Sequence, residues 1–395
     1  MNKQKIRNAI RSLPTHIVII LICLIWIVPT LGLFVTSIRP VQDANTTGWW
    51  TVFSERPGAA EYDQFCAECH GPSGDALANA NLADPEIVGS FRRSIQLAAT
   101  FNREYDGSIH LAEPARPDDQ QLADILSHLQ RISGLQSRPR FTIDNYIDAL
   151  VGYRGTTSYR LDCEAGTQAV DLTCDFMTDL GNSRGMGRAL LNTLIVTIPS
   201  TLLPIIFAAF AAYAFAWQEF KGRMWLFALL IGLQIIPLQM TLVPISRLYA
   251  EMGLNGTFLG VWLFHTGFGL PYAIYLMRNF IGSLPRELFE SAYLDGASHW
   301  TAFYRLVLPL SIPAIASLGI FQFLWIWNDL LVALVFLGGN KPVLTYQING
   351  LVQSLGGGWQ LLTAAAFISM LIPLFVFFGF QRYFVRGLLA GSVKG

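Results

Sequence analysis

Charged residues are scarce in this chain: Asp, Glu, Lys and Arg together make up 14% of its 395 residues, whereas about 25% is usual for a soluble protein. The sequence also lacks a G-x-x-x-x-G-K-[ST] loop, the motif with which many proteins cradle nucleotide phosphates. These absences exclude an ordinary soluble protein and a chain that binds ATP through that loop. If ATP drives its activity, another subunit binds the nucleotide.

Hydrophobic residues are abundant instead, at 52% of the chain, and they occur in long runs. A helix needs about 20 apolar residues to cross the roughly 30 Å hydrocarbon core of a bilayer. The sequence therefore predicts six membrane spans, at about 17–38, 189–217, 224–249, 257–281, 310–337 and 360–385. The first run begins after basic residues but lacks a small-x-small cleavage site, so we expect a retained anchor rather than a signal peptide.

Lysine is absent from residues 39–187, which carry twelve Arg and 21 Asp or Glu and so have a net charge of about −9. The rest of the chain has fifteen basic and six acidic residues, a net charge of about +9. Its basic residues gather before the first span, between spans two and three, between spans four and five, and after the last. The positive-inside rule therefore predicts that both termini are cytoplasmic and that residues 39–187 lie outside.

The most specific short motif in this outer loop is Cys66-Ala67-Glu68-Cys69-His70. Two thiols at this spacing can both form thioethers with the vinyl groups of a haem, and the following imidazole can then bind the iron. A chance occurrence, a redox thiol pair and a zinc site are the alternatives. A zinc site would need further ligands, and a thioredoxin-type motif would need a preceding strand, and neither is evident.

Residues 57–132 resemble a class I cytochrome c, with helices expected at about 57–69, 91–103 and 117–132. The resemblance implies covalent haem c on Cys66 and Cys69, with His70 as the proximal iron ligand. That family usually supplies a loop methionine as the distal ligand, but no Met lies between Gly71 and Arg140. His110 occupies the corresponding place and is our candidate distal ligand. Five-coordinate iron, or a distal His128, are the alternatives.

Three further residues of the chain are candidates for structural or functional roles. Cys163 and Cys174 have ten intervening residues and lie in the outer loop, where an oxidising environment favours a disulfide over two free thiols. Asp329 lies within the fifth predicted span, where a carboxylate is unfavourable unless it is paired or hydrated. It is either a functional residue or a structural contact between helices.

Residues 284–313 form a long polar interruption among the C-terminal spans, LPRELFESAYLDGASHWTAFYRLVLPLSIP. Pro285 is suited to the first turn of a helix, and Glu287 and Glu290 would favour the positive end of its dipole. Gly296 should end this helix, and a second helical piece is expected over 301–308, ending at Pro309. The pattern predicts a cytoplasmic helix–turn–helix lying against the membrane, available to a partner.

This segment resembles the coupling loop of ATP-binding-cassette importer permeases, whose pattern is E-A-A, three residues, Gly, nine residues, and then a hydrophobic-x-L-P sequence. Ser291 in place of Ala is the only departure. The resemblance implies that a short helix here docks into a cleft of the ATPase subunit. The residues it assigns to this coupling are Glu290, Ala292, Asp295, Gly296, Leu308 and Pro309.

The C-terminal tail and the Trp327-Asn328-Asp329 element resemble the sugar-specific branch, in particular the second permease subunit of maltose-type systems. Residues 1–50 and 139–395 resemble most closely the α-glucoside members. The resemblance implies a membrane subunit that catalyses no covalent reaction, and the cytochrome c-like piece between these ranges is an insertion outside the pattern common to that family. The alternative from another class is a membrane-anchored c-type cytochrome, an electron carrier that uses the permease part as a scaffold.

The expected fold class is all-α: a bundle of six membrane helices with a small helical extracytoplasmic domain. The expected location is the bacterial inner membrane, with residues 39–187 in the periplasm. The expected partners are an ATPase dimer, a second permease subunit, a periplasmic sugar-binding protein, the lipid bilayer and a redox partner, and no nucleic acid. The expected domains are a first span (1–50), a cytochrome c-like insertion (51–138), a disulfide-containing loop (139–187) and the permease domain (188–395).

Overall fold

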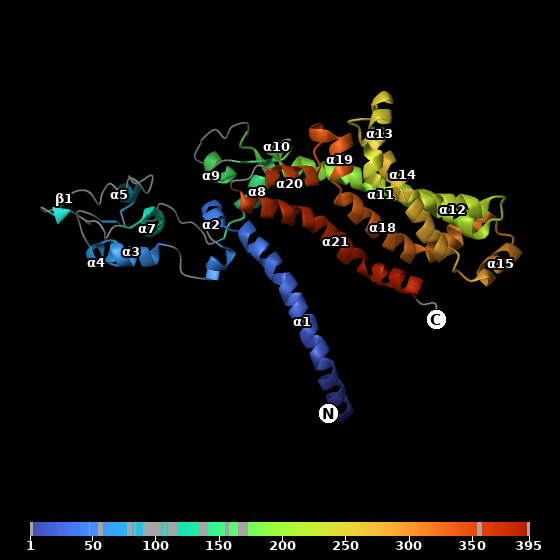
Figure 1. The fold of residues 1–395 in the computed structure, drawn as a ribbon, viewed down its shortest axis with the longest axis horizontal. Coiled ribbons are helices and arrows are strands. Elements are labelled where there is room, and N and C mark those ends of the chain that lie inside the picture. Colours follow the sequence, from blue (N-terminus) through green and yellow to red (C-terminus); the bar gives the residue numbers. More distant parts are fainter. Residues whose placement is uncertain are drawn as a thin grey trace. The chain divides into compact units, whose positions relative to one another are not determined.

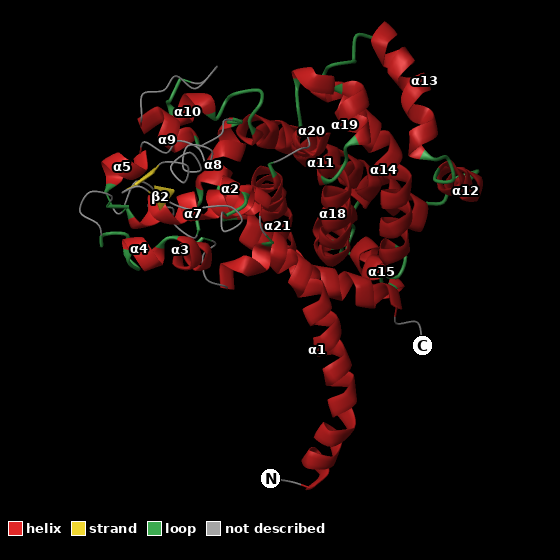
Figure 2. Cartoon of the chain, turned by 60° about the vertical axis from the view of Figure 1, so that its left-hand side comes forward, coloured by secondary structure: helices red, strands yellow, loops and turns green. Residues whose placement is uncertain are grey.

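The computed structural model divides the chain into two compact units, Met1–Asn145 and Tyr146–Gly395. Both are helical, and among the described residues the strands β1 (Glu104–Tyr105) and β2 (Ser108–Ile109) pair in one short antiparallel ladder (Figure 2). The structure describes residues 3–46, 48–53, 58–76, 81–82, 84–89, 104–105, 108–109, 117–133, 141–154, 158–164, 173–353 and 358–392.

The first unit begins with one long apolar helix, which is followed by short helices. Between residues 17 and 34 the helix exposes most of its large apolar side chains, as expected for a segment surrounded by lipid. The elements of this unit are α1 (Lys3–Ser37), α2 (Val41–Thr46), the 3₁₀ helix Trp49–Phe53, α3 (Ala59–Phe65), α4 (Ala67–His70), α5 (Pro85–Gly89) and α7 (Asp119–Ile132).

The expected helices of the cytochrome-like segment are present at its two ends, while the middle one, at 91–103, lies outside the described residues. α3 packs on α7 around a core that includes Tyr62, Ile125 and Leu129. Gly58, at φ +94°, allows this close packing, because a Cβ there would overlap the carbonyl oxygen of Asp124. The N–H of Gly58 is capped by the Glu61 carboxylate at 2.9 Å.

The second unit is a helix bundle preceded by short helices. The first of these, α8, begins two residues before the boundary between the units. Its elements are α8 (Asp144–Val151), α9 (Tyr159–Glu164), α10 (Phe176–Asp179), α11 (Met186–Trp217), α12 (Arg223–Leu233), α13 (Leu238–Glu251), α14 (Phe258–Ile281), α15 (Arg286–Leu294), α16 (His299–Ala302), the π-helical turn Phe303–Val307, α17 (Leu308–Leu310), α18 (Ile312–Trp327), α19 (Leu331–Phe336), the 3₁₀ turn Gly338–Asn340, α20 (Leu344–Gln353) and α21 (Trp359–Ser392).

α11 lies along α14 and α18, and α18 lies along α21, so these four helices form the bundle (Figure 1). Small side chains on α11, among them Ala208, Ala209 and Ala212, are buried at the contact and let the backbones approach closely. Without a hydrophobic driving force in lipid, such close packing is what holds membrane helices together.

Three helices among the described residues are long and apolar enough to cross a membrane: Pro14–Ser37, Met186–Trp217 and Trp359–Arg382. Two bent helix pairs raise the number to five if each is counted as one span. The remaining predicted span, 257–281, corresponds to α14, which has 24 residues but is not among these helices. The structure therefore supports a polytopic membrane protein, and six spans stay a prediction.

Two predicted spans are not single helices. The run at 224–249 bends by 96° between α12 and α13, because Pro237 has no N–H and disfavours a helical conformation of the preceding residue. The run at 310–337 ends as α18 at Trp327, and α19 starts afresh at Leu331. Asp329 causes this second break, since its Oδ2 accepts hydrogen bonds from the N–H groups of Val332 and Ala333, at 3.0 and 3.2 Å.

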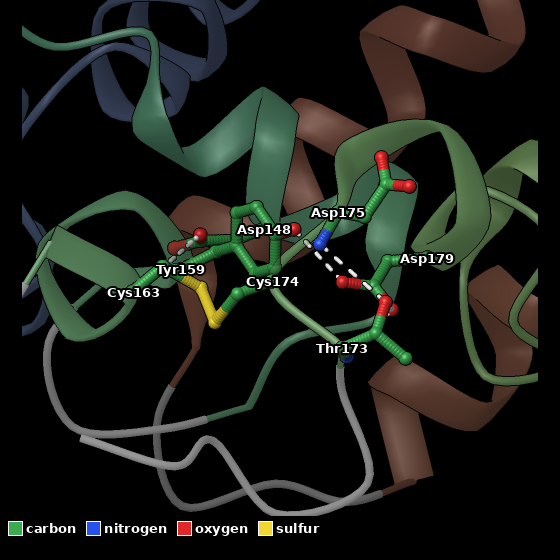
Figure 3. The surroundings of a disulfide bond; sticks show 7 residues. All are labelled: Asp148, Tyr159, Cys163, Thr173, Cys174, Asp175 and Asp179. Carbon is green, nitrogen blue, oxygen red and sulfur yellow. Dashed lines mark hydrogen bonds between the residues drawn. A yellow bond between two sulfur atoms is a disulfide. The ribbon is translucent and has the colours of Figure 1, made fainter. Parts of the chain in front are cut away.

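A buried acidic network organises the segment before the bundle, where Cys163 and Cys174 are joined in a disulfide (Figure 3). The Asp179 carboxylate accepts hydrogen bonds from the Tyr159 hydroxyl at 2.8 Å and from the backbone and hydroxyl of Thr173 at 2.9 and 3.0 Å. Burial alone would raise the pKa of Asp179, but these hydrogen bonds hold the pKa below its ordinary value. Burial and the bond to Asp179 raise the pKa of Tyr159 to about 12.

Replacing Asp179→Asn should loosen this network, because an amide places a donor where the carboxylate only accepts, and it leaves a buried group unpaired. We expect the free energy of local opening around Thr173 and Tyr159 to fall by about 1–3 kcal/mol, measured by amide hydrogen exchange. Asp175→Asn is the control, since Asp175 is exposed and Asn also caps the N-terminus of α10. Equal exchange in the two variants would contradict this role.

The same network should depend on pH. A carboxyl whose pKa is lowered by folding stabilises the folded state at any pH above its ordinary pKa, which is 3.8 for Asp179. That stability is lost as the pH falls through the lower pKa of the folded state. Protection of these amides should therefore be constant from neutral pH down to about pH 4 and decline below it.

Candidate functional site

The polar segment at 284–313 forms the predicted helix–turn–helix. Pro285 precedes α15, which ends at Leu294 with Asp295 as its C-cap residue. Gly296 follows at φ +82°, a left-handed conformation that favours glycine, and a Cβ on it would meet nothing within 4 Å. The turn therefore needs glycine for its backbone conformation and not for close packing within the chain.

The second helical piece differs in its limits from the predicted 301–308. It begins at His299, capped by the Ser298 hydroxyl, which accepts from the Thr301 N–H at 3.2 Å, and it continues through Pro309 to Leu310. Proline is tolerated because the preceding turn, Phe303–Val307, widens to a π-helix, which relieves the clash between the proline ring and the backbone before it. The chain then bends by 68° into α18.

An aromatic stack fixes α15 to the membrane bundle. Phe289 is the only fully buried residue of α15, and its ring lies on the indole of Trp217, with 3.8 Å between ring centres and 23° between planes. The Trp217 Nε1–H donates to the carbonyl of Ile281, the last residue of α14, at 3.1 Å. One indole at the end of α11 therefore connects α15 to both α11 and α14.

A polar cluster adds a second connection between the segment and the bundle. The hydroxyls of Tyr213 and Tyr293 lie 3.0 Å apart, and each lies within 3.2 Å of the Nδ1 atom of His299. Tyr213 belongs to α11 and is buried, whereas the other two residues belong to α15 and α16. The cluster therefore ties both arms of the helix–turn–helix to one point on α11.

The opposite face of the segment is exposed and combines acidic with apolar side chains. Glu287, Glu290 and Asp295 are exposed, and Leu288 and Leu294 have 40% and 88% of their surface accessible. This face of α15 therefore presents carboxylates and two leucines together to its surroundings. The other predicted coupling residues also lie along this stretch: Gly296 and Pro309 are exposed, and Ala292 and Leu308 are half-buried.

Asp329 lies in the turn between α18 and α19 and has a structural role there as the cap of α19. The Nε2 atom of His265 on α14 is 3.9 Å from its Oδ2, and the His265 ring lies edge-on to Trp325. His265 is fully buried, and neither of its ring nitrogens has a hydrogen-bond partner among the residues that the structure describes. The contact between helices that the sequence left open as an alternative is therefore present.

The CxxCH motif lies at the junction of α3 and α4. Cys66 and His70 are buried, with 6% of their surface accessible, while Cys69 is exposed, and neither cysteine is in a disulfide. Burial, with a smaller contribution from Cys69, raises the pKa of the Cys66 thiol to about 12. Since a thiolate is the reactive form of cysteine, this environment disfavours the redox alternative. The described residues include no group of three or more His, Cys, Asp or Glu that could hold a metal ion.

Of the two candidate distal ligands, the structure describes only His128. His110 lies outside the described residues. His128, the alternative, belongs to α7, and its ring is 4.9 Å from that of Tyr62. The Tyr62 hydroxyl donates to the carbonyl of Gly71 at 2.8 Å, just after the motif. The choice of distal ligand therefore stays a prediction.

Sequence reasoning missed the residues that attach the segment to the bundle. Trp217 and Tyr213 lie four residues apart and so share one face of α11. An indole and a phenol at the end of an apolar run are also the expected aromatic residues of a membrane interface. That spacing was the available signal, but it does not distinguish packing on another helix from contact with lipid head groups.

Comparison with known proteins gives a consistent picture. Residues 189–389 match the family model described as "Binding-protein-dependent transport system inner membrane component". The osmoprotective compounds uptake permease protein GgtD of Synechocystis sp. is 42% identical over 386 residues, which cover 97% of this chain and 93% of that protein. The alpha-glucoside transport system permease protein AglG of Rhizobium meliloti is 42% identical over 398 residues, covering 96% of each.

A third relative aligns with a shorter part of the chain. The melibiose/raffinose/stachyose import permease protein MelC of Bacillus subtilis is 35% identical over 227 residues, covering 57% of this chain and 82% of that protein. The family model leaves the outer loop out, whereas the alignments with GgtD and AglG extend across residues 39–187.

The substitution Phe289→Ala should detach α15 from the bundle. Loss of a buried aromatic ring costs about 3–5 kcal/mol, and here no other residue of α15 is fully buried to compensate. We expect faster amide hydrogen exchange throughout 286–294 in the detergent-solubilised chain. Leu288→Ala is the matched control, because this neighbouring side chain is exposed. If both variants exchange like the parent chain, the stack does not hold the helix.

Proposed function

The chain belongs to the family of binding-protein-dependent transport system inner membrane components and is a permease of an ATP-binding-cassette sugar importer, not itself an enzyme; on this premise we propose that it imports α-glucosides or related oligosaccharides. Two relatives support this substrate class, since AglG is an alpha-glucoside permease and MelC imports melibiose, raffinose and stachyose. It works with a periplasmic binding protein and other subunits, of which we propose a second permease and an ATPase dimer.

The observation that carries the transport mechanism is the two-sided character of the segment at 285–310. One side is fixed to α11 and α14 through Trp217, Phe289 and the Tyr213 cluster. The other exposes the acidic and apolar side chains that include Glu290 and Leu294. A helix that is held firmly on one side and exposed on the other is suited to receive a displacement and pass it on.

In this mechanism the exposed side docks on the ATPase subunit. When ATP closes the ATPase dimer, the docked segment is displaced as a rigid body. Buried Phe289 and Phe303 transmit that displacement to the bundle, because close-packed interiors shift between discrete arrangements rather than deform continuously. The bundle then alternates between facing the cytoplasm and facing the periplasm.

The sidedness of the chain is part of the proposal. The segment belongs to the positively charged part of the chain, and residues 39–187 to the negatively charged part. A disulfide between Cys163 and Cys174 accords with an oxidising compartment for that loop. We therefore assign six spans, cytoplasmic termini and a periplasmic loop at 39–187.

Substitutions at two matched glycines can separate an effect on docking from an effect on folding. Gly296 and Gly222 have φ of +82° and +83°, and a Cβ on either meets nothing within 4 Å. Gly296→Val and Gly222→Val should therefore impose similar backbone strain, but only the first should disturb docking. We expect Gly296→Val to reduce sugar-stimulated ATP hydrolysis of the assembled complex at least roughly tenfold, equivalent to about 1.4 kcal/mol, and Gly222→Val to leave it near the parent rate.

Charge reversal supplies the companion variant. Glu290→Lys should reduce the stimulated ATP hydrolysis as Gly296→Val does, whereas Glu219→Lys, exposed in the preceding cytoplasmic loop, should not. Unchanged stimulation in both Glu290→Lys and Gly296→Val would refute the assignment of this segment as the coupling element.

We also propose that the first unit carries haem c, for electron transfer or for redox sensing that regulates uptake. The residues present fit the group: two free thiols and a buried imidazole share one helical turn, beside a core of Tyr62, Leu82 and Val88. Cys66 and Cys69 would hold the porphyrin covalently, and His70 would bind the iron from the proximal side. The haem would supply reversible one-electron chemistry.

The rival function, an electron carrier with the permease part as scaffold, is the less favoured one. A scaffold has no need for an exposed segment fixed to the bundle by a buried ring and a three-residue polar cluster. The haem and the transport functions are otherwise independent, so that either can fail without the other.

Covalent haem attachment has a direct test. The chain should be produced in a host able to mature c-type cytochromes, and haem should be measured by the absorbance of the denatured chain. Cys66→Ala and Cys69→Ala should each lower the covalent haem signal, and the double variant should abolish it. Cys23→Ala should keep it, because Cys23 belongs to α1. Absence of covalent haem from the parent chain would exclude the group.

A further inference from the structure

The disulfide in the segment before the bundle joins two residues of unequal exposure. Cys174 is exposed, whereas Cys163 is half-buried and packs against the cluster of Val151, Tyr153 and Tyr159. A thiol from outside the chain therefore reaches the bond from the side of Cys174, and the Cys163 sulfur is the leaving group (Figure 3). Access of this kind is one of the conditions for exchange between a disulfide and a thiol.

The backbone of Cys174 has an unfavourable conformation. Its φ is +59°, and among the residues that the structure describes no other residue except glycine has a positive φ. A residue with a Cβ disfavours this left-handed region, because the Cβ comes too close to the following carbonyl oxygen. Such a conformation persists only where the surrounding structure holds it. Interactions beyond the preference of the residue itself therefore fix Cys174 in place.

Two constraints hold Cys174 in this conformation. One is the disulfide. The other is the buried carboxylate of Asp179, which accepts hydrogen bonds from the successive N–H groups of Thr173, at 2.9 Å, and Cys174. The same carboxylate accepts from the Tyr159 hydroxyl at 2.8 Å, and Tyr159 belongs to the cluster on which Cys163 packs. The disulfide and the Asp179 network therefore support the same backbone, so that loss of one weakens the other.

Hydrogen bonds continue from this network to the helices of the bundle. The carbonyl of Asp179 accepts from the N–H of Asn182 at 2.9 Å, in the turn that leads into α11. In the same turn, the carbonyl of Ser183 accepts from the side chain of Gln347, on α20, at 2.6 Å. α20 in turn packs on α11 and α21. A change at the disulfide therefore acts on the start of α11 and on the contact between this turn and α20.

We propose that Cys163–Cys174 is a site of reversible thiol–disulfide exchange with a dithiol reductant, and that reduction lowers sugar uptake by loosening the segment that leads into α11. A thiolate of the dithiol attacks the Cys174 sulfur, and the Cys163 sulfur leaves as a thiolate that takes a proton from water. The second thiol of the reductant loses its proton, attacks its own partner sulfur in the mixed disulfide and releases Cys174, which is protonated in turn. Two electrons and two protons thus pass from the dithiol, which becomes a disulfide, to the two cysteines.

A disulfide that serves stability alone accords less well with the backbone at Cys174. Reduction allows Cys174 to return to a favoured φ, whereas closing the bond returns it to the left-handed region. Strained or exposed disulfides are the labile and regulatory ones, while structural disulfides resist reduction. Here Cys174 carries both the strained backbone and the exposure. The effect on uptake rests on the proposed import function, whereas the exchange itself does not.

Differential alkylation tests the exchange in the folded chain. Free thiols of the detergent-solubilised chain are first blocked with N-ethylmaleimide, and the chain is then equilibrated with mixtures of reduced and oxidised dithiothreitol. Both cysteines lie in one tryptic peptide, residues 161–184, which contains no other cysteine, so its mass after a second alkylation reports their oxidation state. We expect reversible reduction without denaturant. Reduction only after the chain is unfolded would overturn the proposal.

Two variants test the coupling between the disulfide and Asp179. Asp179→Asn and Tyr159→Phe should each raise the equilibrium constant for reduction, because the disulfide loses part of the network that supports its backbone. The expected rise is at least about fivefold for Asp179→Asn, the lower end of the couplings usual between linked sites. It is about two- to tenfold for Tyr159→Phe, the effect of one lost hydrogen bond, and this variant keeps the packed ring.

Asp175→Asn is the matched control, because Asp175 is exposed and Asn also caps α10. Its equilibrium constant for reduction should equal that of the parent chain. Unchanged constants in both network variants, or an equal rise in the control, would refute the coupling. If Asp179→Asn does not fold, Tyr159→Phe decides the question alone.

Uptake measures the consequence for transport. The assembled importer in proteoliposomes receives ATP, its binding protein and the radiolabelled α-glucosides maltose, sucrose and trehalose, before reduction with dithiothreitol, after it, and after reoxidation. Reduction should lower uptake of the imported sugar and reoxidation should restore it. A double variant, Cys163→Ser with Cys174→Ser, should import at the rate of the reduced parent in all three conditions.

Uptake that reduction does not change, or that falls equally on reduction of the double variant, would overturn the control of transport by this disulfide. If the parent complex imports none of the three sugars, the proposed function fails. The alkylation measurement needs no transport, so it still decides whether the disulfide exchanges and whether Asp179 supports it.

Discussion

The burial of one aromatic ring, Phe289, against the indole of Trp217 is the interaction on which the placement of α15 depends. α15 is otherwise largely exposed and has no other fully buried side chain; the next buried side chains of the segment are Ala302, Phe303 and Val307. Without the stack, a nine-residue helix would be marginal in water. With it, and with the hydrogen-bonded cluster around Tyr213, the helix becomes a rigid extension of α11, so that its exposed side can present a fixed surface to another subunit.

The second constraint is the need of every backbone group at membrane depth for a partner. It explains the backbone geometry at two prolines and at Asp329, the carboxylate within the fifth predicted span. Around Pro309 the helix widens into a π-turn, and around Asp329 the carboxylate itself accepts from the N–H groups that begin α19. The chain nevertheless bends in the regions of both prolines, Pro309 and Pro237, by 68° after Leu310 and by 96° between α12 and α13.

Much of this architecture is predictable from sequence because lipid imposes simple rules. An apolar run at 189–217 predicted α11 within three residues, and the pattern of Pro285, Gly296 and Pro309 predicted the helix–turn–helix. The bends were not predictable, since proline alone does not decide them: Pro199, Pro204 and Pro271 all remain inside continuous helices. Likewise Tyr213 and His299 are 86 residues apart, and no local pattern connects them.

The segment at 285–310 acts on the bundle through one further helix, α14. Trp217 receives Phe289 on its ring and donates to the carbonyl of Ile281, so a displacement of α15 acts on the end of α14. On that helix the 14 residues from Gly267 to Ile281 span about 21 Å. Buried side chains along this stretch, Ala273, Ile274 and Met277, pack in the core that also contains Phe289 and Phe303. A close-packed interior transmits strain between the groups that it holds. A displacement of the segment at 285–310 is therefore passed to α14 through Trp217 and this shared core.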